Sequence, residues 1–109
     1  MKRKPRPTRE RTLRRSDERA AQSLANDRER LFRLEAGGSP GRPIEVGSAS
    51  VIEAYALSMR CPRCDGAHEL REHLAVTLEG ARLREVRLVC RQCGSRRSLF
   101  FRLRDDRPN

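Results

Sequence analysis

The sequence lacks tryptophan, and aromatic residues make up only 4% of its 109 positions. Hydrophobic residues of all kinds reach 36%, so little apolar surface is present for burial in a core. Domains this small usually need a second source of stability, such as a disulfide or a bound metal ion. The four cysteines of the chain have the chemistry for either role.

A long apolar run is also missing. The N-terminus is basic, as in a secretory signal peptide, but no apolar segment follows it. No stretch approaches the roughly 20 apolar residues that span a bilayer. We therefore expect a cytoplasmic protein without a membrane partner, in which thiols stay reduced and favour metal over disulfides.

Lysine is rare among the basic residues, because only Lys2 and Lys4 are lysine and the other basic residues are arginine. The formal charge is +10, and four thiolates around one Zn²⁺ would leave about +8. Such a charge favours a polyanionic partner, above all nucleic acid. A GC-rich coding sequence is a competing explanation for part of the arginine excess.

The composition divides the chain into five segments. Residues 1–15 are strongly basic with few apolar positions and predict a disordered arm. A helix is predicted at 16–36, with Ser16 as its N-cap, and a Gly- and Pro-rich linker at 37–43. The remaining segments are a compact domain at 44–104 and a tail at 105–109. The apolar stripe of the helix is interrupted, so its docking on the domain stays open.

Alternation of apolar and polar residues indicates β-strands after the linker. Residues 50–59 alternate and are interpreted as a strand, although their Ala-rich centre is also compatible with a helix. Glu79-Gly80 has the composition of a tight turn. The other extended segments are 44–46, 70–78, 83–89 and 98–103.

Two C-x-x-C segments carry the clearest chemical signal. Cys61 and Cys64 form one pair, Cys90 and Cys93 form the other, and 25 residues separate the pairs. Each tight turn presents two sulfurs to one ion, and a hairpin between the pairs brings them together. Gly66 and Gly94 follow the pairs, where we expect a left-handed backbone that directs amides at the thiolates.

From Arg60 to Leu103 the chain resembles the zinc-ribbon group, whose members carry two such knuckles on short β-hairpins. The resemblance implies a zinc ribbon with one Zn²⁺ as cofactor. Together with the elements predicted above, we expect a small α+β fold, in which a ribbon of three to four antiparallel strands is preceded by one N-terminal helix and a disordered basic arm. It does not imply one function, because ribbons occur in transcription, translation and replication proteins and as stability elements in enzymes.

Other roles of the cysteines stay open, namely rubredoxin-like iron, a redox-active pair and disulfides. If zinc stabilises the fold, chelation should unfold residues 44–104. His68 and His73 are expected to be ordinary surface residues, because four cysteines already complete a tetrahedral shell. A closed Cys₄ site leaves no position for a substrate, and no catalytic motif is present. We therefore expect no enzyme activity, no catalytic residues and no small-molecule substrate.

Non-specific nucleic-acid binding is the leading functional hypothesis, through phosphate contacts of the basic arm and of the second cysteine pair. Phe100 or Phe101 has the chemistry to stack on a base, but neighbours in a strand point to opposite faces, so at most one belongs to the core. The alternative is a protein-interaction adapter with no nucleic-acid contact. The predicted nucleic-acid-binding residues are Lys2, Arg3, Lys4, Arg6, Arg9, Arg11, Arg14, Arg15, Arg91, Arg96 and Arg97.

Overall fold

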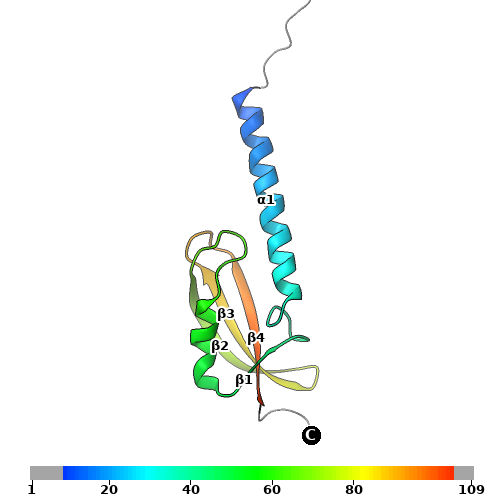
Figure 1. Cartoon of the computed structure of the whole chain (residues 1–109), viewed down its shortest axis with the longest axis vertical. Helices are drawn as coiled ribbons and strands as arrows, with labels where there is room; N and C mark the ends of the chain where they lie inside the picture. The colour runs from blue at the N-terminus through cyan, green and yellow to red at the C-terminus, as the bar shows by residue number, and fades with distance from the viewer. Residues whose placement is uncertain (1–8, 105–109) are drawn as a thin grey trace, which may run out of the picture.

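The computed structural model describes residues 9–104, and it confirms a small α+β fold with one long helix, one short helix and a four-stranded sheet (Figure 1). The predicted tail and most of the predicted arm lie outside the described residues. The elements in chain order are α1 (Glu10–Leu34), β1 (Ile44–Val46), the 3₁₀ turn η1 (Ala49–Val51), α2 (Ile52–Ser58), β2 (His68–Leu78), β3 (Ala81–Cys90) and β4 (Arg96–Leu103).

The sheet has the order β1-β4-β3-β2. β2, β3 and β4 form an antiparallel meander whose strands enclose the three segments predicted for them. Glu79 and Gly80 turn the chain between β2 and β3, both with positive φ. The prediction of an entirely antiparallel ribbon is wrong at one edge, because β1 pairs with β4 in parallel and the sheet is mixed. A parallel pair needs a long connection, and residues 47–95 provide it.

The strand predicted at 50–59 is wrong, since this segment forms η1 and α2. Its two buried side chains, Ile52 and Ala56, lie four residues apart, which is the helical and not the strand spacing. Tyr55 makes an edge-to-face contact with Phe101 of β4, with ring centroids 5.6 Å apart. Helix α2 therefore packs its narrow apolar face on the sheet. It ends at Ser58, and Cys61 follows three residues later.

The core lies between α2 and one face of the sheet. Phe101, Ile52 and Leu99 have no exposed surface. Phe100 is also buried but lies outside the core cluster, and its backbone amide donates to the Gly37 carbonyl at 2.8 Å. This confirms that only one of the two phenylalanines belongs to the core, while the other lies against the linker. The core cluster consists of Val46, Ile52, Ala56, Val86, Leu88, Leu99 and Phe101.

Helix α1 begins at Glu10, so the predicted start at Ser16 and the predicted disorder of residues 10–15 are wrong. Arg9 occupies the N-cap position without a side-chain cap, while Glu10 suits the positive end of the helix dipole. Residues 10–15 are mostly strong helix formers, which explains the longer helix. Every residue from 10 to 24 is exposed, and this part of α1 projects away from the sheet (Figure 1).

The C-terminal turns of α1 dock on the domain. Glu29 is buried, and Phe32 packs against the core cluster. The helix ends at Leu34, whose carbonyl accepts a hydrogen bond from Arg42 at 2.5 Å. Among the helices of residues 9–104, none combines the length and the apolar character needed to cross a bilayer.

Candidate metal centre

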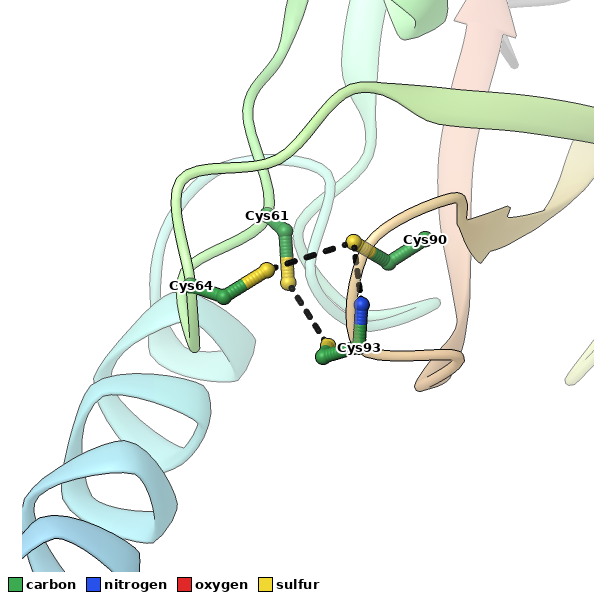
Figure 2. A group of neighbouring side chains, drawn as sticks. All are labelled: Cys61, Cys64, Cys90 and Cys93. Atoms are coloured by element: carbon green, nitrogen blue, oxygen red, sulfur yellow. Dashed lines mark hydrogen bonds between the residues drawn. The ribbon is translucent and has the colours of Figure 1, made fainter.

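The two C-x-x-C turns meet at one end of the sheet. The first, Cys61–Gly66, joins α2 to β2, and the second, Cys90–Ser95, joins β3 to β4. His68 pairs with Cys90 across β2 and β3, and the Arg91 amide donates to the Ala67 carbonyl at 2.9 Å. The β2–β3 hairpin thus closes the gap of 25 residues and directs all four sulfurs to one point (Figure 2).

The four sulfur atoms have the separations of a tetrahedral site. All lie within 4.8 Å of one another, with 3.7 Å between Cys61 and Cys93 and 3.3 Å between Cys64 and Cys90. A Zn–S bond length of about 2.3 Å requires sulfurs about 3.8 Å apart at tetrahedral angles. The same separations are far beyond the roughly 2.05 Å of a disulfide bond, and all four thiols are free. This cluster can therefore hold one metal ion.

Backbone amides favour the thiolate form of the first cysteine in each turn. Burial acts to raise the pKa of Cys61, but hydrogen bonds from Ser95 and the amides of Cys64 and Arg63 lower it to about 6. Burial likewise acts to raise the pKa of Cys90, and the amides of Cys93 and Gln92 outweigh it.

Cys64 behaves in the opposite way. Burial and a hydrogen bond with Cys90 raise the pKa of Cys64 to about 12. A metal ion requires all four sulfurs as thiolates, so its binding would displace the protons that remain. The amides that surround Cys61 and Cys90 are the groups that would stabilise the resulting negative charge.

The glycines of the two turns have different roles. Gly94 has the expected left-handed backbone, with φ of 76°, and its amide donates to the Cys90 carbonyl. In the first turn the prediction for Gly66 is wrong, because Asp65 takes the left-handed position with φ of 63°. Gly66 is required for a close approach instead: a Cβ atom there would lie 2.9 Å from the sulfur of Cys90.

Ser95 joins the sulfurs to the rest of the domain. Its hydroxyl oxygen lies 3.1 Å from the sulfur of Cys93 and 3.5 Å from that of Cys61. The same oxygen accepts a hydrogen bond of 2.8 Å from Arg97. The sequence does not indicate this contact of Ser95, since serine after a C-x-x-C-G turn has no distinctive spacing.

Arg97 is buried, with 3% of its side chain exposed, so its predicted place in a nucleic-acid surface is wrong. It forms an ion pair with Glu29 of α1, with 2.8 Å between Nη2 and Oε2. Burial acts to lower the pKa of Arg97, but Glu29 and the nearby Cys61 raise it above its ordinary value. The partners lie 68 positions apart in the chain, so no local pattern could have indicated the pair.

The histidines are not the surface residues that we expected. His68 is buried, with Nδ1 2.8 Å from the Met59 carbonyl and Nε2 beside Arg97. His73 is largely buried as well, and its Nδ1 lies 3.3 Å from Glu53. Neither belongs to the four-sulfur cluster, but His68 supports the loop that leads into Cys61.

The other predicted nucleic-acid contacts fall into three groups. Lys2, Arg3, Lys4 and Arg6 lie outside the described residues. Arg9, Arg11, Arg14 and Arg15 are exposed at the free end of α1. Arg91 and Arg96 are exposed in the second cysteine turn and at the start of β4, so the described part of the predicted surface is divided between the free end of α1 and the sheet.

Comparison with known proteins assigns no family, because no family model, curated protein or solved structure matches the chain. Two features of the molecule therefore bear on function, namely the geometry of the cysteine cluster and the exposed arginines of α1.

Proposed function

We propose that this chain is a zinc-stabilised module of the zinc-ribbon type that binds nucleic acid through α1. Four cysteines in two amide-rich turns are the ligand set of structural zinc sites, which leave no open coordination position. Thiols that must stay reduced fit a cytoplasmic location. Metal analysis of the purified protein tests the first part: one zinc per chain is expected, and stoichiometric iron would contradict it.

The observation that carries the proposed nucleic-acid binding is the placement of exposed arginines on one side of the projecting part of α1. Arg11, Arg15 and Arg19 are spaced four residues apart and share one side of the helix, which we call the arginine face. All three are exposed, and no carboxylate of residues 9–104 lies within ion-pairing distance of them. By contrast, Arg14 pairs with Glu10 at 3.7 Å.

The dimensions of α1 favour a duplex as the ligand. A helix with its side chains is about 10–12 Å wide, and the major groove of B-DNA is about 12 Å wide. The major groove of duplex RNA is too narrow for a helix. Because the first fifteen residues of α1 touch no other element, they can enter a groove without a clash from the sheet.

Binding of zinc-loaded protein to labelled DNA and RNA at several salt concentrations tests this proposal. Replacing Arg11, Arg15 and Arg19 with glutamine should weaken DNA binding and lower the salt slope by about 0.9 for each lost phosphate contact. The matched control replaces three exposed arginines far from the arginine face, namely Arg71, Arg82 and Arg104.

Equal losses in the two variants would mean that net charge and not α1 determines the affinity. A protein lacking residues 1–8 separates the contribution of the predicted arm from that of the helix. No binding by the unaltered protein at low salt would overturn the proposal.

A protein-interaction role is the second candidate, favoured by exposed leucines on the opposite side of α1. Leu13, Leu24, Leu31 and Leu34 are between 51% and 62% exposed. At 100° per residue they fall within about 80° of one another, so they form an apolar stripe. Recovery of one stoichiometric partner after nuclease treatment, lost in a Leu24→Ser, Leu31→Ser variant, would support this alternative.

A further inference from the structure

The side chain of Arg97 connects the metal centre to α1. Its Nε and Nη2 atoms donate to the two carboxylate oxygens of Glu29, at 3.3 Å and 2.8 Å. Nη2 also donates to Ser95, whose hydroxyl contacts the sulfurs of Cys61 and Cys93. One planar guanidinium group thus touches the helix on one side and the serine that contacts two metal ligands on the other.

The remaining contacts of Arg97 fix its orientation. Its Nη1 donates to Nε2 of His68, which leaves the ring proton of His68 on Nδ1 for the carbonyl of Met59 at 2.8 Å. The guanidinium carbon lies 5.9 Å from the ring centre of Phe32, within reach of a cation–π contact. Arg97 therefore has no freedom to follow α1 if the helix moves.

Burial makes this arrangement sensitive to each of its charges. The side chains of Arg97 and Glu29 are 3% and 9% exposed, and a buried ion without its partner is strongly unfavourable. Four thiolates around a dication carry a net negative charge close to the guanidinium. Outer residues of this kind orient metal ligands and change metal affinity by about 10- to 100-fold.

We infer that Arg97 is a positioning residue through which the metal centre holds the C-terminal turns of α1 on the sheet. With the thiolates held around a metal ion, Ser95 and Arg97 are fixed and Glu29 is kept in place. When the four sulfurs separate, Arg97 loses this support and α1 is released. Metal occupancy thereby sets the direction in which the arginine face points.

Because of thermodynamic linkage, a substitution in α1 can test the inference through its effect on zinc affinity. If the metal strengthens the docking of α1, docking must strengthen metal binding by the same factor. Glu29 touches no sulfur in the structure, yet Glu29→Gln should lower zinc affinity by about tenfold, measured by competition with a chromophoric chelator. Asp27→Asn is the matched control, because Asp27 is an exposed acid of the same helix and, within residues 9–104, pairs only with Arg30. The control should leave zinc affinity unchanged.

Hydrogen–deuterium exchange of the zinc-loaded chain supplies the second measurement. In Glu29→Gln, the amides of residues 25–34 should exchange faster while those of β3 and β4 keep their protection. Arg97→Met should lower zinc affinity too, and adding Glu29→Gln to it should cause no further loss if Arg97 carries the coupling. Should Arg97→Met fail to fold, Ser95→Ala keeps the ion pair, removes the connecting hydroxyl, and should also weaken zinc binding.

Unchanged zinc affinity in Glu29→Gln, with faster exchange at residues 25–34, would overturn the inference, as would additive losses in the double variant. Any effect of metal occupancy on nucleic-acid affinity rests on the proposed function, because it acts through the direction of the arginine face. The coupling between metal binding and the docking of α1 does not rest on it. A chain that binds no nucleic acid but shows the zinc effect would therefore refute only the proposed function.

Discussion

The two halves of α1 differ in what determines their conformation. The first half, residues 10–24, is exposed at every position and is helical through local propensity and intrahelical pairs. The second half is fixed by the buried contact of Glu29 with Arg97, beside the metal centre. One continuous helix thus combines a part that tolerates substitution with a part that contacts the cysteine cluster through Arg97 and Ser95.

Chelation should have the largest effect, because structural zinc contributes about 10–16 kcal/mol in small domains that fold on metal binding. Removal of zinc should abolish the sheet signal in circular dichroism and the slow exchange of β3 and β4 amides. Residues 10–24 of α1 are exposed at every position, so we expect their amides to exchange fast with or without zinc. A sheet that survives stoichiometric zinc removal would contradict the assignment of the metal as the main source of stability.

Two alanine substitutions compare how much a core side chain and a side chain of the projecting helix contribute to stability. Phe101→Ala removes a fully buried ring and should cost about 3–5 kcal/mol of unfolding free energy. Leu24→Ala removes a side chain that is 51% exposed and should change stability by about 0.5 kcal/mol or less. Denaturant unfolding of the zinc-loaded variants measures both values, and similar losses would mean that the leucine stripe is covered in solution.

A methyl group at Gly66 tests the close packing of the metal centre. Gly66→Ala places a Cβ about 2.9 Å from the sulfur of Cys90, and we expect overpacking of about 1–3 kcal/mol and weaker zinc binding. Gly41→Ala is the control, because nothing lies within 4 Å of a Cβ atom there. Chelator competition on both variants measures the difference, and equal zinc affinities would show that the turn can widen freely.

Among the substitutions in the two cysteine turns, the smaller effect is expected at the left-handed residues. Gly94→Ala forces a Cβ into φ of 76° and should cost about 1 kcal/mol. Asp65→Gly relieves the same strain in the other turn but makes the unfolded chain more flexible, so the net change should be near zero. Thermal unfolding of both variants checks the order, and a larger loss for Asp65→Gly would assign the Asp65 side chain a role of its own.

Local sequence patterns could predict much of the fold and the cysteine cluster. The paired C-x-x-C spacing and the alternation from 70 to 103 carry their signals over a few residues, and the structure confirms the cluster and the three longer strands. The strand predicted at 50–59 is wrong, because a short amphipathic helix such as α2 also places some apolar residues two apart. The early start of α1 was missed because Ser16 is a good N-cap that the chain does not use.

The rest of the site depends on contacts between distant segments. No property of Arg97 in the sequence distinguishes it from its exposed neighbour Arg96, since their roles differ only through strand parity and the position of Glu29. The burial of polar residues such as His68 could not be predicted from the sequence for the same reason, because their hydrogen-bond partners come from other elements. Pairing of β1 with β4 likewise joins distant segments, and Val46 in the core and the ion pair of Glu45 with Arg102 support it.

The exposure of residues 10–24 has a consequence for how such a chain changes over evolution. Substitutions there should have little effect on folding, whereas a change at Glu29, Ser95 or Arg97 disturbs the buried contact beside the cysteine cluster. The free end of the helix can therefore change in single steps while the part docked beside the four cysteines stays constant. Relatives of this protein should be recognisable by the cysteine turns and the buried ion pair, even where their first helical residues share no similarity.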